Sequence, residues 1–549
     1  YPDAGSVSLF AQYALPSPPA STFLSGSSNT FVVRPFGFAF RGASSTTTVQ
    51  HGTSATATKL AAAGANFTMT LGAYRWAAGE DTDSDGVPDA GVDITNNGLT
   101  SNFAAAVTVA ASANLPGIAT GAISRGATCA SAASIAAASF SGGAATITDW
   151  CYGEVGNVFL TATASNYITS GITVTGNSGM DGTGTAGGYV GRFVPDNFAV
   201  SLNTPQFAAS CNAGAFTYVG QSFAYSTAAG MLPEITVTAR NRLNATTSNY
   251  VGAYMKFSNA TGTSLNQAPY DTQSGRYARF DALGGGTTPV LTVSPSSVSG
   301  DPTIGTFTAG VGKLTFGSGF AFSFARSSTT PSAPFNADIG LAINVIDSDG
   351  VAYAGNPATF GAATLNGGIS FGGATADAMR YGRMRLNNSY GSALLDLPQA
   401  LSVEYYNAGG FQLNTDDSCT TLVASNIRMS AVTGNTDLSV GCKTGLSPAG
   451  TIPFNGGKAS STASPSAFSP LKLTKPGSGN NGSVNLTVNL DGTSTGNTCA
   501  PGSTAVTSAA LPWLLGNWGS STYSANPAGI ATFGVFKSAD EFIYLREVY

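Results

Sequence analysis

The sequence predicts an all-β protein built from tandem immunoglobulin-like antiparallel β-sandwich domains with long loops. Short runs of alternating or β-branched residues recur along the 549 residues, and Gly, Asn, Asp and Pro bound them, which is the pattern of strands. Clear examples are residues 66–71 (NFTMTL), 235–239 (ITVTA), 341–346 (LAINVI) and 483–490 (SVNLTVNL). One Ala-rich run, residues 131–138, could form one or two helical turns.

The composition supports folded sandwiches independently. Only 9% of the residues are charged, against about 25% in an ordinary soluble protein, while Gly (69), Phe (31) and Tyr (20) are abundant. Disorder requires few hydrophobic residues and much charge, so we expect a folded chain. The net charge is −5 and the cations form no stripe, which argues against nucleic acid as a partner. We expect no transmembrane segment, because no apolar run approaches the roughly 20 residues that span a bilayer.

One succession of segments occurs three times. A strand-like run leads through a turn-rich stretch to a second extended segment, in residues 3–13 and 31–40, 154–167 and 189–200, and 337–350 and 381–390. Pro35 and Phe38 of the first copy match Pro195 and Phe198 of the second at the same spacing. Pro35 and Pro195 are 195 − 35 = 160 residues apart. A repeat of this length is far longer than the about 20–50 residues of a solenoid repeat, so it indicates tandem domains.

The repeated segments mark the predicted domain boundaries, near residues 30, 195 and 385. The predicted units are residues 1–30 (the end of an upstream β-domain), 31–195 (a sandwich with an Asp-rich insertion), 196–385 (a second sandwich) and 386–549 (a C-terminal β-domain with Cys and Trp). On this division the chain starts mid-domain. A Thr-Ser-Asn-aromatic tetrad, at residues 100–103 and again at 247–250, supports the equivalence of the two central units.

The cysteines predict disulfides and an oxidising compartment. The six cysteines are Cys129, Cys151, Cys211, Cys419, Cys442 and Cys499. None forms a C-x-x-C pair, which argues against zinc, and an even count in a β-protein rich in Ser and Thr fits an extracellular location. We expect the local pairs Cys129–Cys151 and Cys419–Cys442, which leave Cys211 to pair with Cys499.

Several segments resemble one bacterial family. Residues 381–407 (YGRMRLNNSYGSALLDLPQALSVEYYN), 414–420 (NTDDSCT), 511–514 (LPWL) and 531–549 (ATFGVFKSADEFIYLREVY) resemble the C-terminal region of MshQ-type proteins. Those proteins are associated with the mannose-sensitive haemagglutinin (MSHA) pilus locus of Gram-negative bacteria. The resemblance extends over nearly the whole chain and implies a large, secreted, β-rich surface protein. It implies no catalytic residues, since none is defined for that region.

The strongest local motif is residues 81–89 (DTDSDGVPD). Carboxylates at alternate positions before a Gly can surround one point with oxygens, as Ca²⁺ requires for its about six to eight ligands. The predicted metal ligands are Asp81, Asp83, Asp85, Asp89 and Asp93. Val92 stands where an EF-hand loop has its bidentate Glu, so the motif is closer to the calcium loops of extracellular repeat proteins. The alternative is a solvated acidic hairpin tip. Ca²⁺ is the one cofactor that the sequence suggests.

Enzymatic motifs are weak. His51 is the single histidine and lies in a turn-like stretch, so any Ser-His-Asp or Cys-His mechanism would depend on it. Because a single histidine is a weak basis for such a mechanism, we expect an ordinary surface histidine and no enzymatic activity. The tryptophans either fill cores or form a sugar-stacking platform; they are Trp76, Trp150, Trp513 and Trp518. Arginines at or near the three predicted domain boundaries either bridge domains or cover aromatic neighbours; they are Arg34, Arg192 and Arg383.

These observations favour a non-catalytic structural or adhesive protein of the bacterial surface, one that forms or decorates a filament, sheath or pilus. Its partners would be copies of itself or other surface proteins. A lectin-like array of carbohydrate-binding modules, with glycans as partners, is the first alternative, and a polysaccharide-active hydrolase is the second. The expected location is extracellular or on the outer surface of a Gram-negative bacterium.

Overall fold

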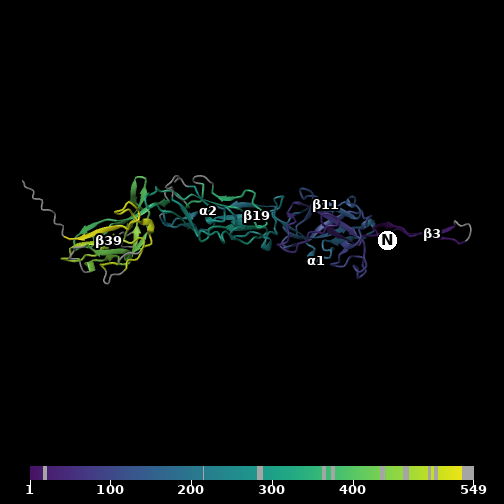
Figure 1. Ribbon diagram of the computed structural model, residues 1–549, viewed down its shortest axis with the longest axis horizontal. Helices are drawn as coiled ribbons and strands as arrows, with labels where there is room; N and C mark the ends of the chain where they lie inside the picture. Colours follow the sequence, from purple (N-terminus) through teal and green to yellow (C-terminus); the bar gives the residue numbers. More distant parts are fainter. Residues whose placement is uncertain are drawn as a thin grey trace, which may run out of the picture.

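Strands provide nearly all of the regular structure, which confirms the all-β prediction. The computed structural model describes residues 1–16, 22–213, 215–280, 289–361, 367–372, 378–432, 438, 441–460, 469–492, 496–499 and 505–534. Three packed bodies follow one another along the long axis, and an N-terminal hairpin projects from the first (Figure 1). The α-helices of the described residues are α1 (Gly184–Gly187) and α2 (Gln273–Arg276), which have four residues each.

The first domain contains a ten-stranded, mostly antiparallel sheet that surrounds its main core. Its strands are β5 (Gly37–Arg41), β6 (Ala61–Ala62), β7 (Asn66–Tyr74), β8 (Val107–Leu115), β9 (Ile123–Arg125), β10 (Ser134–Ile135), β11 (Ala144–Tyr152), β12 (Gly156–Ala164), β13 (Val174–Asn177) and β14 (Val190–Val194). The strand order is β10-β8-β12-β13-β5-β7-β11-β9; β14 also pairs with β12, and β6 pairs with β14. In β7 the alternate residues Phe67, Met69 and Leu71 face the core, as the period of a strand requires.

Four further strands precede this domain: β1 (Gly5–Val7), β2 (Phe10–Ala14), β3 (Phe23–Ser27) and β4 (Phe31–Val33). β1 pairs with β4, and β2 pairs with β3 in the projecting hairpin.

The second domain consists of several small sheets around an aromatic core. Its strands are β15 (Asn197–Leu202), β16 (Phe207–Ala208), β17 (Thr217–Tyr218), β18 (Ala224–Tyr225), β19 (Glu234–Arg240), β20 (Tyr277–Arg279), β21 (Leu291–Ser294), β22 (Thr303–Ile304), β23 (Val311–Thr315), β24 (Ala321–Phe324), β25 (Ile339–Ile343), β26 (Ala358–Phe360) and β27 (Met379–Arg380). The larger sheets are β15-β19-β23-β22 and β20-β25-β26. Phe207 packs on Tyr225 and Phe322 at centroid distances of 4.8 and 5.0 Å, so aromatic rings supply the bulk that short strands lack.

The third domain packs two main sheets, β28-β31-β37-β36-β33 and β29-β40-β39-β34, with a small sheet β30-β38-β35. Its strands are β28 (Gly382–Leu386), β29 (Ser389–Gly391), β30 (Leu397–Pro398), β31 (Leu401–Asn407), β32 (Gly410–Leu413), β33 (Thr421–Val423), β34 (Ile427–Ala431), β35 (Leu446–Ser447), β36 (Thr451–Asn455), β37 (Lys458–Ala459), β38 (Lys472–Leu473), β39 (Gly482–Val488) and β40 (Ala528–Phe533). A single apolar core lies between the sheets.

Short 3-10 turns connect many of these strands. They are η1 (Ile94–Asn96), η2 (Ala137–Ser139), η3 (Tyr167–Thr169), η4 (Gly252–Tyr254), η5 (Ser264–Asn266), η6 (Ala424–Asn426), η7 (Gly441–Lys443) and η8 (Pro512–Leu514). The Ala-rich run at residues 131–138 contains β10 and the start of η2 instead of a helical turn of α type. None of the helices in the described residues has the length and apolar character needed to cross a bilayer.

The two tetrads recognised in the sequence occupy equivalent places. Phe38 of β5 pairs with Ala73 of β7, and Phe198 of β15 pairs with Ala239 of β19. The backbone N–H of the tetrad threonine then bonds the carbonyl of that alanine at 2.9 Å in both domains, from Thr100 in the first and from Thr247 in the second. The first two domains therefore share this strand pair and its contact with the tetrad. The boundaries at residues 30, 195 and 385 stay predictions.

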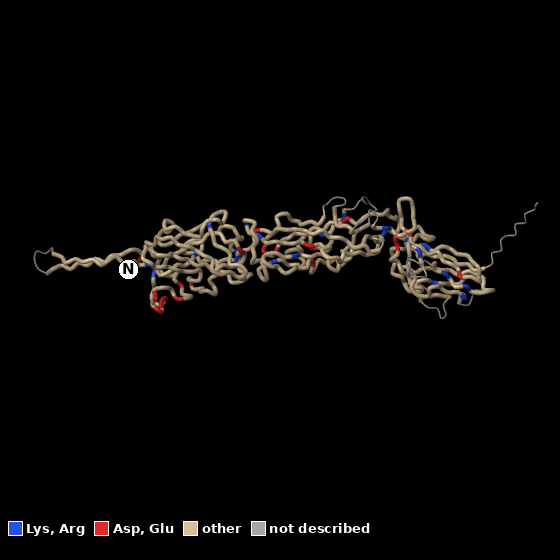
Figure 2. Tube along the Cα trace, turned by 180° about the vertical axis from the view of Figure 1, so that it is seen from behind, with Lys and Arg blue, Asp and Glu red and all other residues tan. Residues whose placement is uncertain are grey.

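Charged side chains are sparse along the whole surface. In Figure 2 most of the tube is uncharged, and acidic residues gather at one edge of the first domain. That edge carries the loop between β7 and η1, which contains the DTDSDGVPD motif.

Candidate functional site

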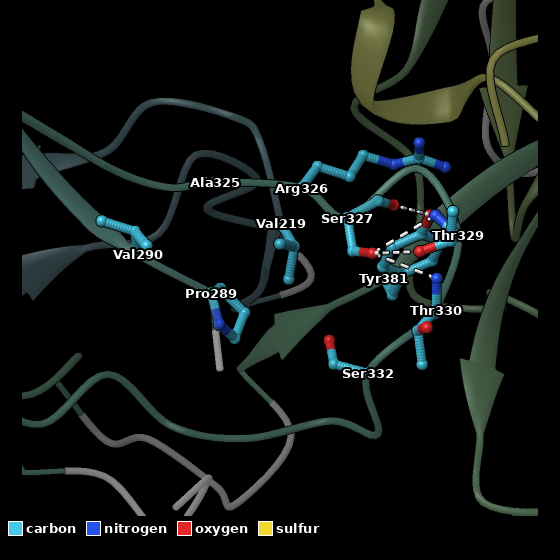
Figure 3. Close-up of a pocket in the computed structure, with 10 residues that line it drawn as sticks. All are labelled: Val219, Pro289, Val290, Ala325, Arg326, Ser327, Thr329, Thr330, Ser332 and Tyr381. Atoms are coloured by element: carbon cyan, nitrogen blue, oxygen red, sulfur yellow. Dashed lines mark hydrogen bonds between the residues drawn. The ribbon is translucent and has the colours of Figure 1, made fainter. Parts of the chain in front are cut away.

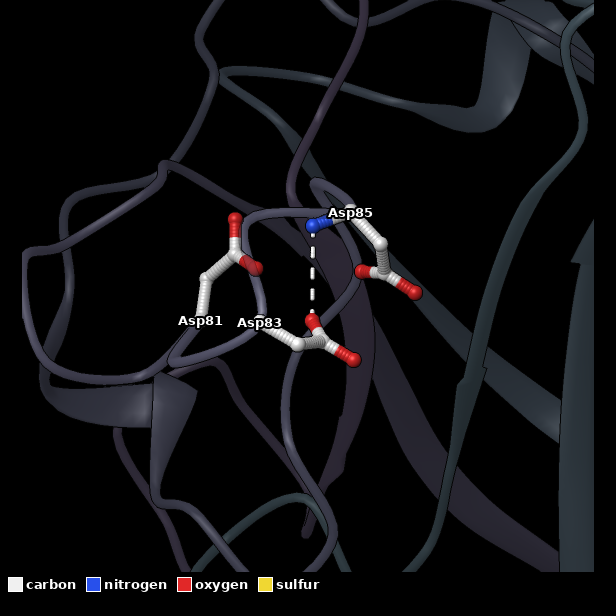
Figure 4. Close-up of side chains that lie close together, drawn as sticks. All are labelled: Asp81, Asp83 and Asp85. Carbon is white, nitrogen blue, oxygen red and sulfur yellow. Dashed lines mark hydrogen bonds between the residues drawn. The ribbon is translucent and has the colours of Figure 1, made fainter.

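Three aspartates of the acidic loop converge. One carboxylate oxygen from each of Asp81, Asp83 and Asp85 lies within 4.8 Å of the other two (Figure 4). Asp81 is partly buried, and the other two are exposed. The Oδ1 atom of Asp81 is buried and has no hydrogen-bond partner. An unpaired buried carboxylate oxygen is costly, because no bond in the fold replaces its lost hydration.

The backbone of the loop holds this cluster in place. The N–H of Asp85 donates to Oδ1 of Asp83, and the N–H of Val87 donates to Oδ1 of Asp85 at 2.7 Å. The N–H of Gly86 donates to Oδ2 of Asp81 at 3.1 Å. Gly86 has a φ of 77°, which favours glycine, so the sequence Asp-Gly permits this turn. Each carboxylate is thus fixed by one backbone donor.

The other two predicted ligands lie outside the cluster. Asp89 is in the same loop, but its Oδ2 accepts hydrogen bonds from the backbone N–H and the hydroxyl of Thr82 at 3.0 and 2.7 Å. Asp93 accepts from the N–H and hydroxyl of Thr95 at 2.9 and 2.6 Å and so caps η1. The oxygen-only donor set of Asp81, Asp83 and Asp85 fits a hard divalent cation such as Ca²⁺.

A buried ion pair joins the first and second domains, at what we call the first joint. Arg192 of β14 donates from Nη1 to Oδ2 of Asp349 at 2.5 Å and from Nη2 to Oδ1 at 2.8 Å. The two side chains are only 6% and 13% exposed. Burial works to raise the pKa of the Asp349 carboxyl, but the bonds from Arg192 outweigh it and hold that pKa below its usual value. Arg192 therefore bridges two domains.

The first joint also contains a carboxylate that caps the tetrad of the second domain. Oε1 of Glu154 accepts from the N–H of Ser248 at 2.9 Å, and Oε2 accepts from the N–H of Asn249 at 3.1 Å. The amide of Asn249 donates in turn to Oδ1 of Asn114 in β8 at 3.0 Å. Burial raises the pKa of Glu154, although the backbone donors oppose this shift. Polar groups from both domains thus satisfy each other out of contact with water.

The buried carboxyl of Asp347, two residues from Asp349 of the ion pair, should make the free energy of unfolding depend on pH. Its side chain accepts from the hydroxyl of Tyr250 at 2.8 Å and from the N–H of Val351 at 3.0 Å, and burial raises its pKa to about 6. The folded-state pKa lies above the unfolded value of about 3.9, so the folded state binds the proton more tightly between these pH values. The contribution is complete below about pH 4 and is lost as the pH rises through about 6.

We expect Asp347→Asn to remove this dependence. The wild-type free energy of unfolding should gain up to about 3 kcal/mol relative to the variant when the pH falls from 7 to 4. Urea unfolding of both proteins across this range measures the difference. Parallel pH profiles for the two proteins would contradict the assignment.

The second and third domains interlock at the second joint. The segment around β17 comes from the second domain, yet Cys211, Phe216 and Tyr218 are buried in the core of the third. The hydroxyl of Tyr218 donates to Oδ2 of Asp417 at 2.7 Å. Cys211 forms a disulfide with Cys419. A segment of one domain is therefore bonded covalently into the next.

Arg326 adds polar contacts across the second joint. Its Nη1 donates to the carbonyl of Tyr523 at 2.8 Å, and its Nη2 donates to the carbonyl of Leu515 at 2.7 Å. The guanidinium lies 4.2 Å from the ring centroid of Tyr381. Planar stacking and several donors suit Arg to such a position, and Lys would replace neither.

A pocket of about 310 Å³ lies beside Arg326 (Figure 3). Hydroxyl and apolar side chains line it: Val219, Pro289, Val290, Ala325, Arg326, Ser327, Thr329, Thr330, Ser332 and Tyr381. The hydroxyl of Ser327 accepts from the N–H groups of Thr329 and Thr330 at 3.3 and 3.0 Å, so it serves the turn. These described lining residues include neither a carboxylate nor a histidine, and the Arg326 guanidinium is bonded to the third domain. The pocket is thus a feature of the joint.

The disulfides correct part of the predicted pairing. They are Cys129–Cys151, Cys211–Cys419 and Cys442–Cys499. The first pairing is confirmed, whereas the predicted pairs Cys419–Cys442 and Cys211–Cys499 are wrong. Short sequence separation favoured Cys419–Cys442, but the segment that enters the third core places Cys211 next to Cys419, with a Cα–Cα distance of 5.5 Å.

The other two arginines near predicted domain boundaries act within single domains. Arg383 donates to Oε2 of Glu404 at 2.7 Å and lies 3.8 Å from the ring centroid of Phe411. Arg34 donates to the carbonyl of Gly86 and so supports the acidic loop. Of the three, only Arg192 is bonded across a joint in these contacts.

The tryptophans are dispersed among different environments. Trp150 is buried in the first core at 1% exposure, as the core interpretation predicts. Trp513 packs against the third core, and Trp518 donates to the carbonyl of Met384 at 3.1 Å. Trp76 is 58% exposed, and its Nε1 donates to Oδ2 of Asp81 at 3.2 Å. A platform of four tryptophans does not form, but one exposed indole adjoins the acidic cluster.

His51 is bonded more firmly than an ordinary surface residue. Its Nε2 lies 2.6 Å from Oδ2 of Asp181, and its Nδ1 lies 3.2 Å from the carbonyl oxygen of Tyr189. The side chain is 17% exposed. Because both ring nitrogens have partners, His51 ties the loop before β6 to the segment around β14.

This fold and these joints define a class: an elongated, disulfide-bonded protein of tandem β-sandwiches. Comparison with protein families gives the particular assignment. Family models match the second domain of DUF6701 over residues 34–147, the third over 154–366 and the fourth over 380–548. The chain is therefore a DUF6701 protein with three consecutive domains of that family, whose function is unknown.

Two further comparisons add little. No curated protein matches the sequence. Among solved structures, a crystal structure from Corynebacterium diphtheriae, provisionally described as a membrane-anchored protein, aligns over 97% of both chains at 10% identity with a TM-score of 0.12. A TM-score this low carries no argument about fold or function.

Proposed function

We propose that this protein is a non-catalytic structural or adhesive rod of the bacterial surface. The observation that carries the proposal is the construction of the joints. Arg192 and Asp349 fix the first domain to the second, and Cys211–Cys419 fixes the second to the third. Domains of one chain ordinarily move relative to each other unless their interface is large and apolar. A buried ion pair at the first joint and a disulfide at the second instead favour a spacer of constant shape.

The surface supports the same role. With charges on only 9% of residues, few repulsions oppose side-by-side packing of such rods. Open strand edges would allow one chain to pair with another. We infer that the partners are copies of this protein or other surface proteins.

The proposed location is extracellular, on the outer surface of a Gram-negative bacterium. Three disulfides are typical of proteins in oxidising compartments. The resemblance of residues 381–407 and 531–549 to MshQ-type proteins supports an association with a type IV pilus.

Negative-stain electron microscopy of the purified chain tests the rod. We expect particles with three bodies in one fixed relative orientation, alone or assembled into filaments. Particles with widely variable angles at both joints would contradict the proposal, because a flexible string cannot act as a spacer of constant length.

Glycan binding at the acidic edge is the second candidate. Trp76 exposes its ring and adjoins Asp81, and an aromatic face with nearby carboxylates can hold the apolar face of a sugar. Binding on a glycan array that Trp76→Ala abolishes, and that Trp513→Ala leaves intact, would favour this function over a purely structural one.

We further propose that the acidic loop binds Ca²⁺ and so stiffens the edge of the first domain. At a Ca²⁺ concentration about 100-fold above Kd, the free energy of unfolding should rise by about 2.7 kcal/mol. Chelation should expose residues 81–93 to protease, as peptide mapping would detect.

Asp83→Asn combined with Asp85→Asn should abolish the calcium effect. Asp491→Asn, at an exposed position of the third domain, is the matched control and should preserve it. Identical cleavage of the wild-type loop with and without chelator would refute calcium binding.

A further inference from the structure

The projecting β2–β3 hairpin exposes large apolar side chains. Leu9, Tyr13 and Leu24 are 61%, 63% and 62% exposed. β2 and β3 pair only with each other among the described strands. An isolated two-stranded hairpin is marginally stable in water, so these features require an explanation.

The same hairpin occurs inside the first domain. Ala11 pairs with Gly26 between β2 and β3, and Ala162 pairs with Gly176 between β12 and β13. The flanking strands agree in register too, since Gly5 pairs with Val33 as Gly156 pairs with Phe193. Residues 5–33 thus follow the chain course of 156–193.

The two hairpins also contain the same pair of hydrogen bonds between a leucine and a serine. The N–H of Leu9 donates to Oγ of Ser28 at 2.9 Å, and the N–H of Ser28 donates to the carbonyl of Leu9 at 2.8 Å. In the first domain, Leu160 and Ser178 exchange the same two bonds at 3.0 and 2.9 Å. These three coincident residue pairs establish that the two hairpins are equivalent.

Asp3 and Glu154, which precede the two equivalent segments, make the same contact with the domain that follows each of them. Oδ1 of Asp3 accepts from the N–H of Asn102 at 3.0 Å, in the tetrad of the first domain. Glu154 accepts from Asn249 in the tetrad of the second. Residues 3–33 are therefore placed against the first domain in the same way as residues 154–193 are placed against the second.

The surroundings of the two hairpins differ. β12 pairs antiparallel with β8 on its outer edge, and β13 pairs parallel with β5. In the third domain the paired antiparallel strands β39 and β40 likewise lie between an antiparallel strand (β34) and a parallel one (β29). Leu160 and Val174, which correspond to Leu9 and Leu24, are fully buried.

We infer that β2–β3 is the closing hairpin of a further β-sandwich of this build, formed by polypeptide that precedes it in the same chain. That sandwich would supply an antiparallel strand along β2 and a parallel strand along β3, and would cover Leu9 and Leu24. Asp3 would then cap a third joint of the same kind as the one at Glu154.

A second copy of the chain is a less suitable partner for the β2–β3 hairpin than a preceding part of the same chain. The place between β8 and β5 already holds the strand pair β12–β13, and the place between β34 and β29 holds the strand pair β39–β40. Insertion of a second copy would have to displace one of them. The matched family models are numbered from second to fourth, which agrees with a sandwich before the first domain described here.

Hydrogen exchange on two polypeptides tests the inference: residues 1–549, and the full product of the gene. In the full product, the amides of β2 and β3 should exchange at least about tenfold more slowly, independently of protein concentration. Leu24→Asp, or the milder Leu24→Ala, should reverse this protection.

Ser25→Asp is the matched control, because the corresponding Thr175 is exposed. It should leave the protection unchanged, and none of the variants should alter the melting of residues 1–549. Exchange equally fast in both polypeptides would overturn the inference. Protection that appears only as concentration rises would overturn it in favour of a second copy.

Discussion

Asp349→Ala will lower the free energy of unfolding by about 3 kcal/mol, because it leaves the buried guanidinium of Arg192 without its anion. Arg192 is 6% exposed, and both of its terminal nitrogens donate to this one carboxylate. Its Nε keeps the carbonyl of Ala57 at 2.7 Å, so the side chain remains held in the joint after the substitution. Chemical denaturation of wild type and variant measures the loss.

The shape of the molecule should change as well. With the ion pair removed, the first joint retains mainly neutral hydrogen bonds, so small-angle scattering should report a wider range of angles between the first two domains. Asp349→Asn should cost less, since the amide oxygen still accepts one bond. Asp396→Ala is the matched control: the side chains of its ion pair with Lys472 are 38% and 36% exposed, so water screens the pair and its loss should cost much less. An Asp349→Ala variant no less stable than Asp396→Ala would refute the role of the pair.

The sequence could predict the turn that carries Asp349, but not its partner. Asp-Ser-Asp-Gly at the end of a strand is a turn signal, and the N–H of Gly350 does bond the carbonyl of Asp347 at 3.0 Å. Arg192 could be assigned to a joint from the repeat alone. Their contact depends on how two separately folded domains dock, and local patterns contain no information on docking.

The acidic loop shows the same limit on a smaller scale. Alternation of carboxylates predicted that Asp81, Asp83 and Asp85 would converge, because turns with Asp and Gly are local structures. The pattern could not reveal that Asp89 would bond to Thr82 or that Asp93 would cap η1. Those roles depend on where the loop rejoins the sheet.

The disulfides depend even more on tertiary structure. A short loop costs less entropy to close, which made Cys419–Cys442 the natural expectation. The actual partner of Cys419 is Cys211, although 208 residues separate them in the sequence. Burial of Phe216 and Tyr218 in the third core places Cys211 beside Cys419. Apolar burial of a whole segment outweighs the entropy difference between a short and a long loop.

Removal of that disulfide should therefore weaken the second joint more than any other single bond there. In the chain-entropy model, closing a loop of 208 residues stabilises the fold by roughly 5 kcal/mol. We expect Cys211→Ser with Cys419→Ser to destabilise the protein by up to this amount and to widen the distribution of angles between the second and third domains. Denaturation and electron microscopy measure the two effects.

Cys442→Ser with Cys499→Ser separates stability from orientation. This bond closes 57 residues inside the third domain, so its loss should cost roughly 4 kcal/mol in the same model. The orientation of the domains should nevertheless stay fixed, because neither cysteine belongs to the second joint. If both double variants were equally rigid, Tyr218, Asp417 and Arg326 would suffice to hold the joint, and the disulfide would serve only the stability of the fold. If only the Cys211 variant bends, the bond is what converts two adjoining sandwiches into one rod.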